Sequence, residues 1–255
     1  HGRTRFLMSL SLRIPALLTT TLAALMTFAL AAAAHGAASN VAGHHRIAID
    51  SNPDFSDLTR TAQRNQYVIL HAWQAYKMRA MKAANPDLKV LVYKNLSASI
   101  ASSNKGLYST GVSYQEADEE HPEWFLRNRQ GQRFTFNSFP YLWAMDVGSK
   151  SYQQRWADNV VDELVREGWD GVFMDDTNTT MKYHYTFQNI AKYPSDSAWQ
   201  QATESALAYI GAKIQEAGKL AVPNIGIWGE NPAVGRRWLQ YVTGAMDEMF
   251  VKWGS

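Results

Sequence analysis

The residues best suited to chemistry in this sequence lie in the segment 170–176, which ends on two adjacent carboxylates. A short apolar run that begins at Gly171 leads directly into Asp175 and Asp176. Side chains alternate along a strand, so Asp175 shares a face with Phe173, while Asp176 has the opposite parity. A single aspartate after a strand commonly only caps the next segment, but a doublet after a buried strand favours a functional role.

Two carboxyl groups that flank a bond, one ionised and one protonated, are the machinery of glycosidic cleavage. Glu248 is the best partner for Asp175, because it ends the last apolar segment with the same inward parity. Burial and mutual repulsion raise one pKa of such a pair, which favours Glu248 as the acid. Glu230 is the competing acid, and Asp247 points outward and is assigned a structural role. By its parity, Asp176 orients the loop or binds a substrate hydroxyl.

The elements that position these acids follow one another as alternating strand and helix signals. The predicted strands are residues 46–50, 67–73, 89–95, 170–176, 220–225 and 244–250. The predicted helices are residues 54–66 (capped by Asp54), 74–84, 149–167, 198–216 and 232–241. Six such repeats imply a parallel sheet with right-handed crossovers.

Two features favour an α/β barrel over a doubly wound sheet. No glycine-rich phosphate loop follows the first strand, and a polar residue ends every strand, as around the top of a (β/α)8 TIM barrel. Closure takes eight repeats, so the sequence predicts an incomplete barrel with six of the eight. The side chains expected to contact substrate at this face are Asp50, His71, Trp73, Tyr93, Lys94, Asn95, Asp176, Asn178, Asn224, Trp228 and Glu230. For His71, simple packing is an equal alternative.

A long insertion, about residues 97–147, interrupts the repeats after the third strand. Loops of this length inside a domain are usually functional, and this one is rich in Phe, Tyr and Trp. On the catalytic face it can wall a sugar-binding groove, since aromatic rings stack on sugars. A β-hairpin with its own small core is the alternative, and the two interpretations are compatible.

The N-terminus has the pattern of an export signal. Three arginines, Arg3, Arg5 and Arg13, precede an uncharged run, residues 15–34, that ends in four alanines. We therefore predict a signal peptide at residues 1–38, cleaved after Ala34 or near Ala38, and a secreted domain at residues 39–255. The run is long for a signal, so an uncleaved anchor in the cell envelope stays open. After cleavage no stable membrane association is expected.

Composition excludes several other classes. The net charge is +2, and it is close to neutral without the leader arginines, so nothing indicates a nucleic-acid partner. Cysteine is absent, which excludes disulfides and a lipoprotein anchor. No His-Glu-x-x-His helix or Gly-x-Ser-x-Gly elbow is present, so we expect neither a zinc hydrolase nor a serine hydrolase, and no metal or cofactor.

Four motifs carry a resemblance to a known family: residues 92–95 (Val-Tyr-Lys-Asn), 121–125 (His-Pro-Glu-Trp-Phe), 169–176 and 246–248 (Met-Asp-Glu). The stretch from 47 to 250 resembles the barrel-type glycoside hydrolases, most of all the hypothetical glycosyl hydrolase family fifteen, with polygalactosaminidase-type barrels more distant. The resemblance implies a secreted glycosidase that acts on a polysaccharide or oligosaccharide. It also implies that Asp175 is the nucleophile or base and Glu248 the proton donor.

The sequence departs from the family pattern at its C-terminus, where strands seven and eight would add substrate contacts. A second hypothesis comes from another class of protein, a secreted barrel that binds carbohydrate without cleaving it. Turnover by the intact protein, lost in Asp175→Asn and Glu248→Gln, distinguishes the enzyme from the binder.

Overall fold

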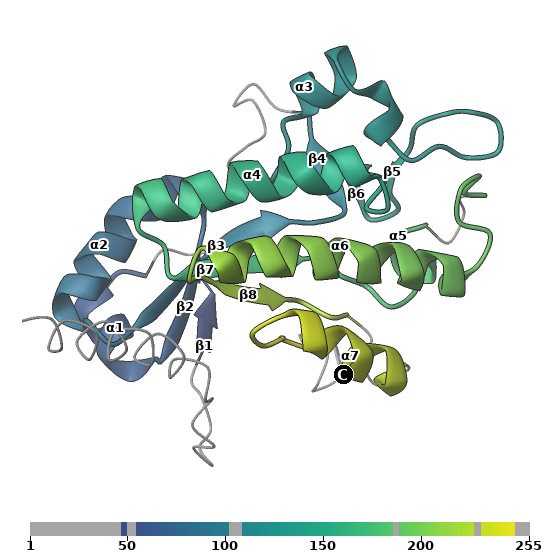
Figure 1. The fold of residues 1–255 in the computed structure, drawn as a ribbon. Helices are drawn as coiled ribbons and strands as arrows, with labels where there is room; N and C mark the ends of the chain where they lie inside the picture. Colours follow the sequence, from purple (N-terminus) through teal and green to yellow (C-terminus); the bar gives the residue numbers. More distant parts are fainter. Residues whose placement is uncertain (1–46, 50–54, 102–108, 186–188, 227–230, 248–255) are drawn as a thin grey trace, which may run out of the picture. The chain divides into compact units, whose positions relative to one another are not determined.

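Parallel strands in sequential order form the main sheet of the computed structural model, which describes residues 47–49, 55–101, 109–185, 189–226 and 231–247. The strands are β1 (Ile47–Ile49), β2 (Tyr67–Leu70), β3 (Lys89–Asn95), β7 (Gly171–Asp175) and β8 (Leu220–Pro223), in that spatial order. Every neighbouring pair is parallel, which confirms the predicted order for these five (Figure 1). The chain divides into two units, His1–His44 and His45–Ser255, and the first lies outside the described ranges.

The sixth predicted strand, residues 244–250, is described only as far as Asp247. There it forms one parallel bridge, between Met246 and Asn224. Met246 N–H donates to the carbonyl of Pro223 at 2.9 Å, and Ile225 N–H donates to the carbonyl of Met246 at 2.8 Å. The segment therefore begins beside the end of β8, where the prediction placed it. The number of repeats and the closure of the barrel remain predictions.

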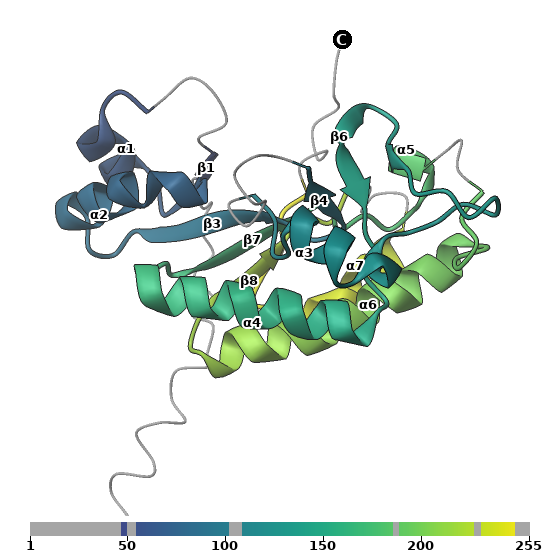
Figure 2. The ribbon, with the colours of Figure 1, turned by 90° about the horizontal axis from the view of Figure 1, so that it is seen from above.

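The predicted helices are present, with small shifts at their ends. They are α1 (Leu58–Arg64), α2 (Ala75–Ala84), α4 (Lys150–Glu167), α6 (Asp196–Glu216) and α7 (Pro232–Trp238), the last continued by a 3-10 turn, η4 (Leu239–Tyr241). Ser149 and Ser195 cap the two long helices, as serine commonly does. Helices α4 and α6 pack against each other along one side of the sheet (Figures 1 and 2). Within the described ranges no helix is both long enough and apolar enough to cross a membrane.

Two of the predicted boundaries were wrong. Strand β2 ends at Leu70, so His71 and Trp73 lie after it, at the start of a 3-10 turn, η1 (Ala72–Gln74). The side chain of Gln74 accepts the backbone N–H of His71 at 2.8 Å and so stabilises this turn instead of a longer strand. Helix α1 is capped by Asp57, whose carboxylate accepts the N–H of Arg60 at 2.8 Å. The expected cap, Asp54, lies outside the described residues.

Apolar side chains cover both faces of the sheet, as expected for buried parallel strands. The larger cluster contains Val172 and Met174 together with the inner faces of α4 and α6. On the opposite face a small cluster joins Phe173 to Met246, and its other members are Ile69, Leu91, Tyr93, Leu220 and Val222. The predicted alternation along β7 is therefore correct, and Phe173 and Met246 share a face as the parity argument required.

The insertion forms a second, antiparallel sheet. Its strands are β4 (Ala98–Ile100), β5 (Thr135–Phe136) and β6 (Phe139–Ala144), in the order β4-β6-β5, and α3 (Tyr114–Glu119) and the 3-10 turn η2 (Pro122–Trp124) lie between β4 and β5. The predicted hairpin is present as β5 and β6, but a separate small core is not. Its buried residues, such as Trp124 and Leu142, belong to the same cluster as those of α4 and α6. The indole N–H of Trp124 also donates to Ser151 of α4 at 2.8 Å.

Gly171 lies where β7 and β8 approach most closely. A Cβ atom at this position would lie 2.3 Å from the carbonyl oxygen of Leu220. We expect Gly171→Ala to lower the free energy of unfolding by about 2 kcal/mol or more, because the backbone of Leu220 cannot move away from the new methyl group as a flexible side chain could. Denaturant unfolding measures the change. Gly244→Ala is the matched control, since no atom lies within 4 Å of its added Cβ. Equal stability of the two variants would contradict the prediction.

Candidate active site

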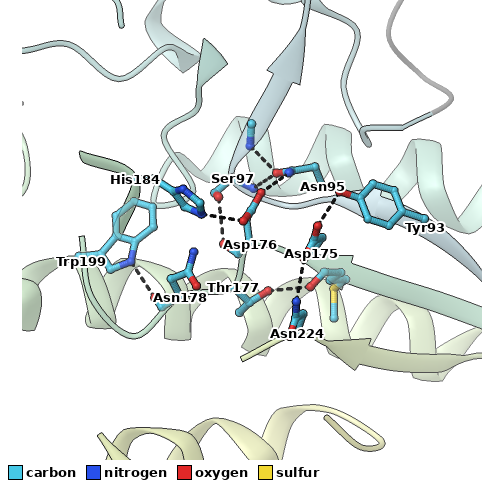
Figure 3. A network of polar contacts seen from close by, with 12 residues as sticks. Tyr93, Asn95, Ser97, Asp175, Asp176, Thr177, Asn178, His184, Trp199 and Asn224 are labelled. Atoms are coloured by element: carbon cyan, nitrogen blue, oxygen red, sulfur yellow. Dashed lines mark hydrogen bonds and ion pairs between the residues drawn. The ribbon is translucent and has the colours of Figure 1, made fainter. Parts of the chain in front are cut away.

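Asp175 is the last residue of β7, and hydrogen bonds from two neighbouring strands hold both of its oxygens (Figure 3). The hydroxyl of Tyr93, on β3, donates to Oδ2 at 2.6 Å. The amide of Asn224, just after β8, donates to Oδ1 at 2.9 Å. Parallel strands bring their C-terminal ends to one edge of the sheet, so residues distant in the sequence meet there. The carboxylate is thus fixed in one orientation by its neighbours.

Burial, and to a smaller extent the negative charge of Asp176, raise the pKa of Asp175 from its usual value to about 6. The hydrogen bonds from Tyr93 and Asn224 favour the ionised form and act in the opposite direction. Burial and the two carboxylates also hold the pKa of Tyr93 well above its usual range. Tyr93 therefore stays protonated and remains a donor to Asp175.

Asp176, the residue directly after β7, does not have the extended backbone of a strand. Its φ of 56° makes it the one non-glycine residue of the described ranges in the left-handed region, which aspartate tolerates better than most residues. Its Oδ2 accepts the amide of Asn95 at 2.5 Å, and its Oδ1 lies 2.7 Å from Nε2 of His184. Strand alternation does not continue past Asp175, so these contacts set the direction of the Asp176 side chain, and its expected role in orienting the loop or binding a hydroxyl stays a prediction. The two carboxylates belong to one network (Figure 3).

Asn95 connects this network to the start of the insertion. Its Oδ1 accepts the backbone N–H groups of Ser97 at 3.0 Å and Ala98 at 2.8 Å. These two donors fix the orientation of the amide, so its NH2 group must face Asp176. The hydroxyl of Ser97 donates to the carbonyl of Asp176 at 2.9 Å. The loop after β3 and the loop after β7 therefore hold each other in place.

His184 is the main residue of this site that the sequence did not indicate. It lies on α5 (Lys182–Tyr185), a single turn that follows the β7 loop. Its ring stacks on Phe136 of β5, with centroids 4.2 Å apart and planes 16° apart. Neither strand nor helix periodicity predicts that a residue eight positions after Asp176 lies beside its carboxylate. Only its type, a histidine shortly after two aspartates, was a signal.

His71 and Trp73 lie near Asp175, on the side of Tyr93. Their rings stack on each other with centroids 4.3 Å apart and planes 5° apart. The His71 ring lies 5.2 Å from that of Tyr93, which bonds Asp175. The Trp73 side is open to solvent, with 53% of the residue exposed. The structure therefore brings these predicted contact residues to one place.

Lys94 is a predicted contact residue that the structure does not bring to the site. It pairs with Met174 across the ladder, on the face that carries α4. Its ammonium is buried and lies 2.6 Å from the carboxylate of Glu163 on that helix. Burial lowers the pKa of Lys94, and the nearby Glu163 opposes this shift. The position is that of a structural ion pair beneath a helix, so the assignment of Lys94 to substrate binding was wrong.

Asn178 is also buried, in the loop after the doublet. Its carbonyl accepts the indole N–H of Trp199 at 2.9 Å, and its side chain lies against the backbone of Gly226. The other predicted residues lie outside the described ranges: Asp50, Trp228, Glu230 and Glu248. Asp247, which was expected to have a structural role, is half-buried. Across the described ranges, no three His, Asp or Glu side chains gather as a metal site would require.

A family comparison identifies the kind of protein to which this site belongs. The model of the hypothetical glycosyl hydrolase family 15 matches residues 82–255. The chain belongs to this family. The match confirms the resemblance carried by the motifs, and it contains the doublet together with Tyr93 and Asn95. It begins within α2, so His71 and Trp73 precede it.

Solved structures share the fold of this family member. Ega3 from Aspergillus fumigatus, in complex with galactosamine, has a TM-score of 0.52 at 11% identity, covering 79% of this chain and 65% of its own. A variant of the glycoside hydrolase domain of PelA from Pseudomonas aeruginosa has a TM-score of 0.50 at 17% identity, covering 75% and 65%. The unmodified PelA domain has a TM-score of 0.48 at 18% identity, covering 74% and 62%. No curated protein sequence matches this chain.

The first two likenesses show the fold alone, because their sequence identities are only 11% and 17%. The fold they show is a mixed α/β domain with a parallel sheet, of the kind found in glycoside hydrolases. The chain spans less than two thirds of each of these relatives.

Proposed function

We propose that this protein hydrolyses O-glycosidic bonds in a polysaccharide or oligosaccharide with a pair of carboxyl groups, Asp175 and Glu248. Membership of a glycosyl hydrolase family supports the reaction class. The observation that carries the proposal is Asp175 itself, at the C-terminal end of a parallel strand, with both oxygens held and its pKa raised to about 6. A perturbed, oriented carboxyl at this edge is typical of a catalytic group.

Asp175 acts in this proposal as the nucleophile or base. Above a pH of about 6 the carboxylate is ionised, and Tyr93 and Asn224 keep it in one orientation. An oriented carboxylate in a partly desolvated place reacts without first reorganising water. Its raised pKa also increases its strength as a base, which favours proton abstraction or attack near neutral pH.

Glu248 is the proposed proton donor. Met246, two residues earlier, shares the sheet face of Phe173 and is bridged to Asn224, which binds Asp175. Continued alternation from Met246 would direct Glu248 to that same face. Glu230 is the competing donor. The separation of the two carboxyl groups decides the stereochemistry, since retaining enzymes place them about 5 Å apart and inverting enzymes about 6.5–9.5 Å apart.

The remaining parts of the proposal concern place and substrate. We propose export by residues 1–38, a barrel of eight repeats in the intact protein, and no metal or cofactor. Carbohydrate is the proposed partner, with no nucleic acid and no stable membrane contact. The galactosamine bound to Ega3 makes amino sugars one class to include in a search for the substrate.

A screen of the full chain on neutral and amino polysaccharides, with chromatography of the products, tests the function. We expect kcat/KM on the cleaved polymer to rise with pH through about 6, because Asp175 must lose its proton, and to fall at higher pH, where the proton donor ionises. Proton NMR of the first-formed product reports its anomeric configuration. Binding of polymers without any cleavage would support the non-catalytic carbohydrate-binding barrel instead.

A further inference from the structure

Each carboxylate of the doublet is the inner end of a line of aromatic rings that leads to the surface. From Asp175 the line runs through Tyr93 and His71 to Trp73, and we call it the Asp175 line. Trp73 is 53% exposed. The rings of this line are held by stacking and by the hydrogen bond from Tyr93, so Trp73 has a defined place relative to the carboxylate.

A second line starts from Asp176. It runs through His184, whose Nε2 lies 2.7 Å from Oδ1, to Phe139 and Tyr141 on β6. The ring centroids of His184 and Phe139 are 6.2 Å apart, and so are those of Phe139 and Tyr141. Tyr141 is 56% exposed. We call this the Asp176 line.

The two lines leave the doublet in different directions. Figure 3 shows His184 and Tyr93 on opposite sides of the Asp175–Asp176 pair. The Asp175 line and the Asp176 line therefore start on opposite sides of the doublet, and their outer ends carry Trp73 and Tyr141.

Trp73 and Tyr141 are exposed at the outer ends of lines of rings that lead to the two carboxylates, so a sugar bound near the doublet could stack on them. The apolar face of a pyranose ring stacks on an aromatic side chain, whereas the hydroxyl groups at its edge stay solvated. A single sugar at the doublet would leave both outer rings without a ligand. A chain of linked sugars that passes over the doublet would cover both.

We infer that the substrate is an extended polysaccharide, bound on both sides of the cleaved bond by Trp73 and Tyr141, and that it is cleaved at internal positions. This inference rests on the proposed function and adds the class of substrate and the mode of attack. Polymer is bound beyond the doublet in both directions, so both products of a first cut remain oligomeric. Sugars released one at a time from a chain end would need a site closed on one side.

Affinity electrophoresis in gels that contain polymer tests the binding without turnover. The proteins are the full chain with Asp175→Asn, alone and combined with Trp73→Ala, Tyr141→Ala or both. The probes are glycol chitosan, dextran, galactomannan and hydroxyethylcellulose. We expect each single change to weaken binding of the retained polymer about tenfold and the pair about a hundredfold, because stacking on separated rings is additive. Tyr76→Ala, an equally exposed aromatic on α2 that belongs to neither line, should change nothing.

Two further variants separate binding from folding. Trp73→Phe should restore most of the affinity, because a ring is kept, and circular dichroism should be the same for all variants. With Asp175 intact, the viscosity of the cleaved polymer should fall well before reducing ends accumulate, as internal cleavage requires. No retardation by any of the four polymers, equal retardation of the Ala variants and Tyr76→Ala, or release of single sugars from the start would each overturn the inference. Retardation that depends on the rings, without cleavage by the wild-type chain, would overturn only the proposed function.

Discussion

Asp175→Asn should abolish hydrolysis and make the folded protein more stable at neutral pH. Turnover should fall by orders of magnitude, because the amide keeps the volume of the side chain but can neither attack nor accept a proton. The amide can still accept the N–H of Asn224 and donate to the oxygen of Tyr93, so the local structure should survive. A substitution that removes function but raises stability indicates that the native side chain lowers the free energy of unfolding.

The stability gain follows from the sign of the pKa shift. Folding raises the pKa of Asp175 from 3.8 to about 6, so the folded protein holds this proton more tightly than the unfolded chain does. Its contribution to stability is therefore greatest below pH 4 and is lost as the pH rises from about 4 to about 6. Removing the charge should recover on the order of 2 kcal/mol at pH 7 and little at pH 4. Denaturant unfolding at both pH values measures the difference.

Asp87→Asn and Asp176→Asn are the controls for this experiment. Asp87 is exposed, and its amide should change neither turnover nor stability. Asp176→Asn removes the negative charge that contributes to the raised pKa of Asp175, so the acid limb of the pH profile should move to lower pH. Its turnover should exceed that of Asp175→Asn. Unchanged turnover in the Asp175→Asn variant would contradict the role of Asp175 as nucleophile or base.

Glu248→Gln should lower turnover of the natural polymer by about two to four orders of magnitude, because the leaving sugar oxygen needs a proton. An aryl glycoside with a dinitrophenolate leaving group needs no such proton, so it should restore much of the rate. This rescue distinguishes a lost proton donor from a damaged fold. Steady-state rates on the two substrates, compared as a ratio, provide the measurement.

Glu230→Gln is the matched variant, since it removes the competing acid by the same change. We expect it to affect polymer and aryl glycoside alike and only modestly. If Glu230→Gln shows the loss and the rescue while Glu248→Gln does not, the role of proton donor belongs to Glu230. A carboxyl separation far beyond about 10 Å in the intact protein would also count against the pair of Asp175 and Glu248.

Regular strands made the central part of the site predictable. In a parallel sheet the ends of neighbouring strands meet, so the sequence placed Asn95, Asp175 and Asn224 together without any knowledge of contacts. Alternation also placed Phe173 and Met246 on one face, as observed. These inferences needed only the order of the strands and a period of two.

Predictions failed where the chain leaves that period. Lys94 was assigned to the site because it lies near a strand end, although its parity matches Met174 and already indicated the helix-covered face. The left-handed turn at Asp176 and the arrival of His184 on a one-turn helix depend on tertiary contacts. Periodicity carries no information about such contacts. A polar residue at a strand end thus indicates the right edge of a sheet, but only its parity indicates the right face.

The shared core of the insertion limits how this protein can be altered. Trp124 and Leu142 belong to the same buried cluster as residues of α4 and α6, so exchanging the segment as a module between relatives would leave a void in that cluster. Substitutions in the insertion are then tolerated mainly at its exposed side chains, such as Tyr141. A change of preferred glycan in this family should therefore proceed by point substitutions along β6, at little cost in folding, rather than by replacement of the whole loop.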